Sequence, residues 1–243
     1  MIKIENTDVY GFEAAIRGMR NPMNSWSKSD SEICDMNCER CETKIYQPCE
    51  CEIRNGEKIS GFSTELFVIG RNDYALMKKL VKAGTDHSKF MRMINFTCDI
   101  IAPLYWWKEF DTYKVGTVRN SCSTMHKIAD KEFTLDDFSC EHLENYGTFG
   151  HFSTKNFFDN FEDMIDTLNA ARELYLQSND KQYWWQMIQL LPSSYNQRST
   201  VQLNYQVLRS IYHARKNHKL DEWKEFCKWV EGLPYSELIT ARK

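Results

Sequence analysis

The sequence predicts an α+β fold in which several long helices pack against a small sheet. Three observations support this prediction. Apolar side chains recur at helical spacing over long segments, they alternate over short ones, and Gly and Pro separate the two kinds of segment. The chain has 243 residues, 42% of them hydrophobic and 14% aromatic, which is enough for a sizeable core. We expect one domain over residues 1–243, with residues 24–70 as an irregular, cysteine-rich insertion within it.

The first predicted elements are a strand and a short helix. Residues 1–10 alternate polar and apolar side chains, as a half-buried strand does. Residues 11–20 fit a helix that ends before Pro22. The following segment, residues 24–70, is the least regular part of the chain and contains Asn55-Gly56, a hairpin signal.

Three further elements are predicted up to Lys114. Asn72 and Asp73 are expected to cap a helix. Alternating apolar side chains predict a strand over residues 94–100, and Pro103 suits the first turn of a helix that runs to about Lys114. The side chains expected to face inward are Leu76, Leu80 and Val81 in the first helix and Ile94, Phe96, Cys98 and Ile100 in the strand.

The last third of the chain predicts four helices. Residues 157–177, residues 184–191 and the C-terminal segment 223–233 each repeat apolar side chains at helical spacing. Residues 202–218 are the fourth, and their pattern is unusual. At about 100° per residue, one face of this helix would hold Asn204, Leu208, Ile211, Arg215 and His218. Such a face, apolar in the middle and polar at both ends, is either a helix edge with satisfied polar groups or an opening to a polar ligand.

Composition excludes some classes of function. The formal net charge of −3 gives no basic surface for non-specific binding to nucleic acid. No run approaches 18 apolar residues, so no membrane span is expected, and the first residues do not resemble a signal peptide. We therefore expect a cytoplasmic protein, in which the nine cysteines are thiols or metal ligands rather than disulfides.

Five cysteines lie close together in the sequence. Cys38 and Cys41 form the Cys-x2-Cys spacing that is typical of a structural zinc site. The pair separated by a single residue, Cys49 and Cys51, is a less usual source of the remaining ligands. A zinc site and a cysteine-rich surface loop without metal therefore both remain as interpretations. The candidate metal ligands are Cys34, Cys38, Cys41, Cys49 and Cys51.

One segment resembles a known family. Pro192 is followed by an Arg after six residues, an Asn after twelve, an Arg after twenty-three and a His after twenty-six; these are Arg198, Asn204, Arg215 and His218. This spacing is similar to that of the flavin-dependent thymidylate synthases, the ThyX family. The resemblance extends to residues 70–125, where a helix, a strand, Ala102-Pro103 and another helix follow in the family's order. It implies a ThyX-like fold with a small, mostly antiparallel sheet, and assembly as a homotetramer.

The resemblance also implies binding roles. Arg198 and Arg215 would bind a pyrimidine nucleotide, with Glu109, Cys122 and Ser123 beside it. FAD would be contacted by Asn204, His218, Arg92, Thr112, Tyr113 and Lys114. NADPH and methylenetetrahydrofolate would be co-substrates. The residues alone also allow roles without a ligand, because Arg198 and Lys114 fit a solvated surface and Tyr113 fits a core.

The chain differs from the family where the Arg-His-Arg signature should lie. Thr112, Tyr113 and Lys114 occupy those three positions, and Thr124 stands where a further signature Arg belongs. Cys122 replaces a serine; a thiolate there could add to a pyrimidine ring, but the sequence identifies no base for it. No catalytic residue is therefore predicted.

Two functions are consistent with these features. The first is a flavin-dependent transfer of a one-carbon unit to a pyrimidine deoxynucleotide, from dUMP to dTMP or a related modification. The second is a relative that binds a nucleotide without catalysis and acts as a sensor or interaction protein. The altered signature favours the second, whereas Asn204 and His218 favour the first. A structural or nucleic-acid module built on the cysteines is disfavoured by the charge balance.

Overall fold

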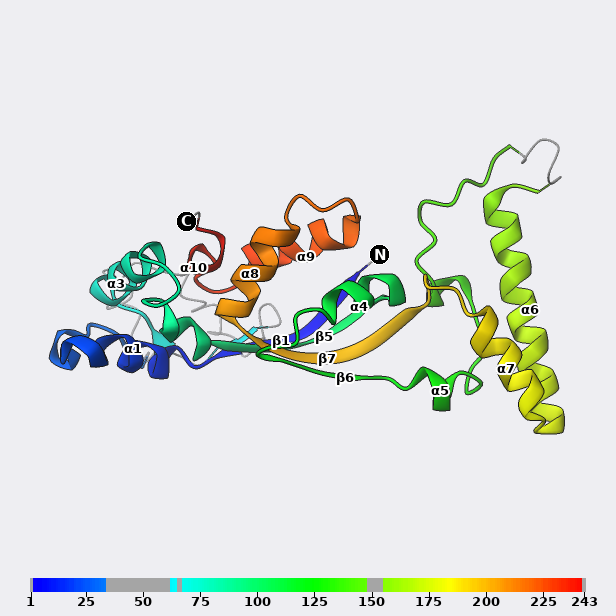
Figure 1. The fold of residues 1–243 in the computed structure, drawn as a ribbon, viewed down its shortest axis with the longest axis horizontal. Coiled ribbons are helices and arrows are strands. Elements are labelled where there is room, and N and C mark those ends of the chain that lie inside the picture. The colour runs from blue at the N-terminus through cyan, green and yellow to red at the C-terminus, as the bar shows by residue number, and fades with distance from the viewer. Residues whose placement is uncertain (1, 34–61, 65–66, 148–154, 242–243) are drawn as a thin grey trace, which may run out of the picture. The chain divides into compact units, whose positions relative to one another are not determined.

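The computed structural model describes residues 2–33, 62–64, 67–147 and 155–241, and it divides the chain into two compact units (Figure 1). Unit 1 comprises Met1–Lys3, Ile101–Thr112 and Asn120–Ser199. Unit 2 comprises Ile4–Ile100, Tyr113–Arg119 and Thr200–Lys243. The single domain expected from the sequence stays a prediction, and each unit is described below by itself.

The strands confirm a mixed helix and sheet fold. Five of them form one sheet in the order β3-β1-β5-β7-β6, and β1 pairs with β3 in parallel, with Thr7 opposite Phe62. Two short strands form a second, antiparallel sheet, with Glu32 opposite Val68. The bounds are β1 Lys3–Tyr10, β2 Glu32–Ile33, β3 Phe62–Thr64, β4 Phe67–Val68, β5 Asn95–Pro103, β6 Thr117–Ser121 and β7 Asn196–Asn204.

Unit 2 is built from α1, α3, α8, α9 and α10 around an aromatic core. Phe12 packs against Tyr205 and Tyr235 with ring centroids 6.0 and 5.2 Å apart, and the buried Tyr205 hydroxyl donates to the Pro234 carbonyl over 2.6 Å. Figure 1 shows α8 and α9 on the same side of the strands. The bounds are α1 Phe12–Arg20, η1 Asn21–Met23, η2 Trp26–Lys28, α3 Arg71–Lys82, η4 Lys89–Arg92, α8 Tyr205–Arg215, α9 Asp221–Glu231 and α10 Glu237–Thr240.

The helix α3 starts differently from the prediction. Its N-cap is Gly70, and the carboxylate of Asp30 accepts the backbone N–H groups of Asn72 and Asp73 at 2.8 and 3.0 Å. Asp73 is therefore not a cap: its side chain is fully buried and pairs with Arg20. The side chains buried by α3 also differ from those predicted, because Val81 is buried as expected but Leu76 and Leu80 are half-exposed. The buried apolar side chains are Tyr74, Met77 and Val81.

Unit 1 contains α4, α5, α6 and α7. The predicted helices at 157–177 and 184–191 correspond to α6 and α7, which pack against each other. Side chains from the segment that precedes α6 complete the core shared by α6 and α7. The buried residues of this core are Ile128, Phe133, Phe138, Ile165, Leu168, Ala171 and Met187. The bounds are α4 Leu104–Phe110, α5 Thr124–Lys127, η5 Leu135–Asp137, α6 Phe157–Ser178 and α7 Lys181–Leu190.

Three tryptophans lie in the cores of the two units. Trp106 and Trp223 have no exposed surface, and Trp107 is 2% exposed. Because these side chains are already buried within the chain, they give no support to the predicted tetramer. Exposed large apolar side chains lie instead on α6 and α7, among other places: Leu174, Leu176, Trp185 and Leu190. Within the described ranges, no helix is long and apolar enough to cross a lipid bilayer.

Candidate functional site

The predicted helix over residues 202–218 is shorter in the structure. Residues up to Asn204 belong to β7, where Val201 and Leu203 point into the core in the alternating pattern of a strand. Asn204 is the N-cap of α8, and its Oδ1 accepts the backbone N–H of Val207 at 3.0 Å. The helix ends at Arg215. Asn204 and Arg215 therefore mark the two ends of α8, and His218 lies beyond the helix that was expected to include it.

The segment Tyr113–Arg119 runs next to α8 within unit 2. Gly116 has a φ of 77°, a left-handed conformation that favours glycine. A Cβ atom at Gly116 would lie 3.1 Å from both Asn204 Nδ2 and Val207 Cγ2. Gly116 thus allows the chain to approach the first turn of α8, and this approach brings the amide of Asn204 against the segment that carries Tyr113 and Lys114.

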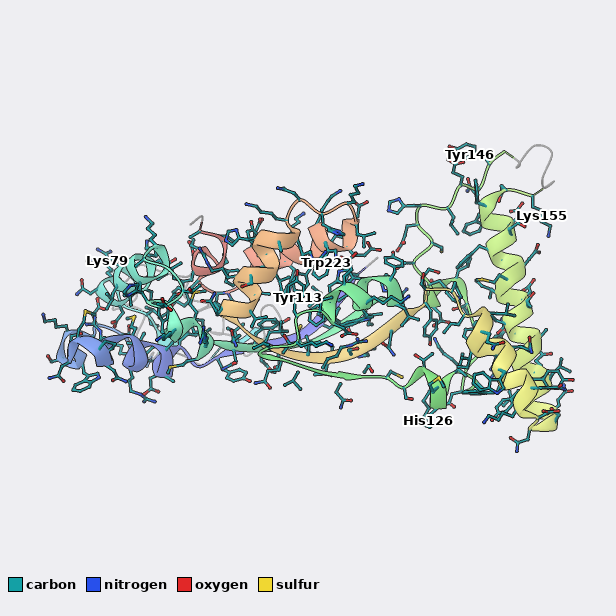
Figure 2. The ribbon with its side chains drawn as sticks, in the orientation of Figure 1. Lys79, Tyr113, His126, Tyr146, Lys155 and Trp223 are labelled. Carbon is teal, nitrogen blue, oxygen red and sulfur yellow. The ribbon has the colours of Figure 1, made fainter. Side chains whose placement is uncertain are left out.

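Arg215 is held between two aromatic rings at the end of α8. Its Nε donates a hydrogen bond of 2.8 Å to the hydroxyl of Tyr113. The guanidinium carbon lies 4.8 Å from the ring centroid of Trp223 and 5.6 Å from that of Tyr113. Both distances are within the range of cation–π attraction. Figure 2 shows Tyr113 and Trp223 near each other, and their centroids are 6.4 Å apart.

His218 belongs to the same cluster. Its ring centroid lies 6.3 Å from that of Trp223, and its backbone N–H donates to the Arg215 carbonyl at 2.9 Å. The ring Nδ1 accepts the backbone N–H of Leu220 at 3.2 Å, so the neutral imidazole carries its proton on Nε2. We call Tyr113, Arg215, His218 and Trp223 the Arg215 cluster. Trp223, which the sequence analysis did not assign to a site, contacts each of the other three.

Two predicted cationic residues lie elsewhere in unit 2. Lys114 is exposed and directly follows Tyr113. Arg92 is exposed at the end of η4, two residues before Ile94, whose carbonyl accepts the N–H of Tyr205 at 2.9 Å. Arg92 therefore belongs to the segment that meets the start of α8, near Asn204.

The remaining candidates belong to unit 1. The backbone N–H of Cys122 donates to the Arg198 carbonyl at 2.9 Å, and both side chains are exposed. Gln197 joins this group, since its Nε2 donates to the Cys122 carbonyl at 2.8 Å and to Thr124 Oγ1 at 3.1 Å. Ser123 caps α5 by accepting the N–H of His126 at 3.3 Å. Sequence reasoning missed Gln197, although it is the neighbour of Arg198.

The helix expected to reach Lys114 ends at Phe110. The apolar residues Trp106, Trp107 and Phe110 are buried, but Asp111, Thr112 and Lys114 are exposed and cannot continue that face. Thr112 lies outside the helix and donates its hydroxyl to the Glu109 carbonyl at 2.7 Å. The signature positions Thr112, Tyr113 and Lys114 therefore lie in the turn and loop that follow α4, outside the helix.

The five clustered cysteines, Cys34 to Cys51, lie outside the described residues, so the zinc site stays a prediction. Among the residues that are described, no group of three or more His, Cys, Asp or Glu side chains is arranged to hold a metal ion.

Comparisons with known proteins identify the fold. No family model matches the chain, and no curated protein matches its sequence significantly. Thymidylate synthase X (ThyX) from Helicobacter pylori, solved with FAD and dUMP, matches with a TM-score of 0.62 and 13% identity over 98% of this chain and 96% of that chain. The UMP/dUMP methylase PolB from Streptomyces cacaoi, solved with 5-Br dUMP, matches with a TM-score of 0.54 and 12% identity over 99% of this chain and 95% of that chain. The chain therefore has the fold of the flavin-dependent thymidylate synthase ThyX.

Proposed function

We propose that the protein binds a pyrimidine nucleoside monophosphate and, with FAD, transfers a one-carbon unit to its base. The observation that carries this proposal is the Arg215 cluster, which lies at the end of α8 in a chain that shares its fold with two proteins solved with dUMP or a brominated dUMP. A guanidinium group whose plane is fixed is well suited to an anionic group such as phosphate.

The proposed nucleotide-binding residues are those that the family resemblance indicates. Arg215 and Arg198 bind the nucleotide, with Glu109, Cys122 and Ser123 as further contacts. Arg198 and Cys122 are exposed and joined through their backbones, so they are accessible to a ligand.

The residues proposed to hold FAD fit its chemistry. A flavin offers carbonyl, ribityl and phosphate oxygens, which need hydrogen-bond donors or cations. Asn204 uses its carbonyl oxygen for the cap of α8 and keeps its Nδ2 as a donor, and Arg92 and Lys114 are exposed cations. We propose that these residues, His218 and the signature positions Thr112 and Tyr113 contact FAD. The bound flavin would supply the redox chemistry, with NADPH as reductant and methylenetetrahydrofolate as carbon donor.

One observation favours a second candidate function, nucleotide binding without catalysis. Tyr113 stands at the histidine of the family's signature, and its hydroxyl accepts a hydrogen bond from Arg215. This contact gives Tyr113 a role in holding Arg215. A protein that had lost the flavin could keep such a nucleotide site and act as a sensor.

Two measurements separate the candidates. The visible absorption spectrum of the purified protein should show a bound flavin if the first holds. Calorimetric titration with dUMP should show binding under both. Binding of dUMP without flavin, even after incubation with FAD, would leave the second candidate, and no binding of dUMP or dCMP would contradict both.

Arg215→Ala should greatly weaken nucleotide binding while the protein stays folded. Loss of charge-assisted hydrogen bonds to a phosphate costs about 2–5 kcal/mol, which weakens binding roughly 30-fold to several thousand-fold. Arg17→Ala is a matched control, because Arg17 is an exposed arginine of unit 2 that pairs with Glu13 on α1. Unchanged dUMP affinity together with a lower melting temperature would show that Arg215 has only a structural role.

Two further proposals concern assembly and metal. We propose a homotetramer, which light scattering would contradict by showing a monomer at micromolar concentration. We also propose that Cys38 and Cys41 bind zinc together with Cys49 or Cys51. Metal analysis after a chelator wash should then find zinc, and less than about half an equivalent would reject the site.

A further inference from the structure

Trp223 connects residues that have separate roles in the proposed function. It lies on α9, its side chain is fully buried, and it packs on Phe226 of the same helix with centroids 5.7 Å apart. Its ring lies under the guanidinium of Arg215 and edge-on to the rings of Tyr113 and His218. One core side chain therefore contacts Arg215, which is proposed to bind the nucleotide, and His218, which is proposed to contact FAD.

Trp223 and Tyr113 together restrain Arg215 in two different ways. The indole face, 4.8 Å away, restrains the guanidinium group from one side, and the hydrogen bond from Nε to the Tyr113 hydroxyl restrains rotation within the plane. An arginine side chain loses much of its rotamer entropy when it is immobilised. If the folded protein has already restricted Arg215, less of this cost falls on ligand binding.

We propose that Trp223 and Tyr113 are positioning residues that fix the guanidinium of Arg215 before the nucleotide binds, and that Trp223 aligns His218 at the same time. This inference rests on the proposed function for its ligand, but the fixed state of Arg215 belongs to the free protein. The role requires an aromatic face at residue 223, because a Leu of similar burial has no π-system to attract a cation.

The first experiment observes Arg215 without any ligand. In protein labelled with 15N-arginine, a guanidinium that is held gives a sharp Nε–Hε NMR signal, which is assigned to Arg215 by its loss in Arg215→Lys. We expect Trp223→Leu and Tyr113→Phe to broaden or remove this signal and Trp223→Phe to retain it in part. Trp229→Leu is the matched control, because Trp229 lies on the same helix and packs on Phe96 and Phe226. The proposal would be overturned if the Arg215 signal were unchanged in Tyr113→Phe and in Trp223→Phe, and also in Trp223→Leu where that variant folds.

The second experiment measures dUMP affinity in a double-mutant cycle. Trp223→Leu should weaken binding about tenfold, and Trp223→Phe by less. On an Arg215→Ala background, monitored at higher dUMP concentration, Trp223→Leu should have no further effect, because Trp223 acts through Arg215. A tenfold loss that persists on that background, or an equal loss in Trp229→Leu, would overturn the positioning role. If the wild-type protein does not bind dUMP, the proposed function fails, while the NMR signal still decides whether Arg215 is held.

Discussion

Two arginines of unit 2 differ in how their charge is accommodated. Arg20 is 4% exposed and is enclosed by the protein: its Nε donates to Asp73 Oδ1 at 2.6 Å, while Nη1 and Nη2 donate to the carbonyls of Ser25 and Lys28 at 3.0 and 2.9 Å. Arg215 is half-buried, and its contacts in the cluster are the Tyr113 hydroxyl and the rings of Trp223 and Tyr113.

The partners of Arg20 are themselves fixed. Asp73 accepts hydrogen bonds through Oδ2 from the hydroxyls of Ser29 and Ser31, both at 2.6 Å, and from two backbone N–H groups of the same segment. We call this group of residues the Arg20–Asp73 network. It ties residues 25–31 to the start of α3, so Arg20 has a structural role.

The contacts of Arg20 are those of a structural arginine. All three nitrogen groups of Arg20 donate to oxygen atoms of the protein, one of them a carboxylate, which neutralises the charge. Arg215 instead lies against the rings of Trp223 and Tyr113, which attract and orient its charge. We therefore expect substitutions in the Arg20–Asp73 network to change stability and substitutions in the Arg215 cluster to change binding.

The largest effect on stability is expected for Asp73→Ala. It leaves Arg20 as a buried charge without its carboxylate, which costs about 3–5 kcal/mol of unfolding free energy. Urea denaturation measures this loss. Glu13→Ala is the control, since it breaks an exposed ion pair with Arg17 and should change stability by less than about 1 kcal/mol. The affinity of folded Asp73→Ala for dUMP should not change; a loss as large as that of Arg215→Ala would break the comparison.

The Arg20–Asp73 network should also make stability depend on pH in acid. Burial alone raises the pKa of Asp73, but hydrogen bonds from Ser29, Ser31 and Arg20 outweigh it and lower the pKa below its usual value. The folded state therefore binds this proton less readily than the unfolded chain. The resulting stability is present above the unfolded pKa of about 3.9 and is lost as the pH falls through the lower folded pKa.

Asp73→Asn tests this dependence because it cannot ionise. The difference in unfolding free energy between the wild type and Asp73→Asn should shrink as the pH falls below about 4. Urea titrations at several pH values measure it. A difference that stays constant down to the acid limit of folding would mean that Asp73 is not the source.

Gly116→Ala should have a smaller effect, localised at the start of α8. An Ala at a φ of 77° costs about 1–2 kcal/mol, and its Cβ would also press on Asn204 and Val207. Gly84→Ala is the matched control, because Gly84 has a φ of 107° but no atom within 4 Å of the added Cβ. Only Gly116→Ala should also weaken ligand binding. Equal effects of the two variants on binding would exclude the segment Tyr113–Arg119 from the site.

The sequence predicted elements with a long or uniform period. The strand of residues 1–10, the helix of 11–20, the buried alternation of β5 and the helices α6 and α7 are confirmed. It failed at the junction of β7 and α8, because the apolar positions around Asn204 fit a strand before it and a helix after it equally well. Only the capping contact of Asn204 with Val207 decides where the helix starts.

The contacts that define the two arginines were beyond sequence reasoning. Arg20 and Asp73 are 53 residues apart and come from different helices, so neither residue indicates the other. Tyr113 lies 102 residues before Arg215. The spacing from Pro192 to His218 made Arg215 a candidate, but it carried no information on Trp223, whose proposed role depends on how α8 and α9 pack.

The smallest effect on stability is expected at Asn204, where a structural and a functional role coincide. Asn204 has a structural role as the N-cap of α8, because its Oδ1 accepts the backbone N–H of Val207. Its Nδ2 is also a proposed donor to FAD. Asn204→Ala removes both functions and should lower the unfolding free energy by about 1 kcal/mol. Asn204→Ser keeps an oxygen that can cap the helix but has no amide donor, so it should restore most of the stability.

Titration of both variants with FAD, followed by the change in visible absorption, separates the two roles of Asn204. If Asn204 binds the flavin, the Ser variant should be nearly as stable as the wild type and yet bind FAD about as weakly as the Ala variant, because both lack Nδ2. If the Ser variant recovers FAD affinity along with stability, Asn204 only caps α8. In that event the functional end of α8 is its C-terminus, where Trp223 and Tyr113 hold Arg215.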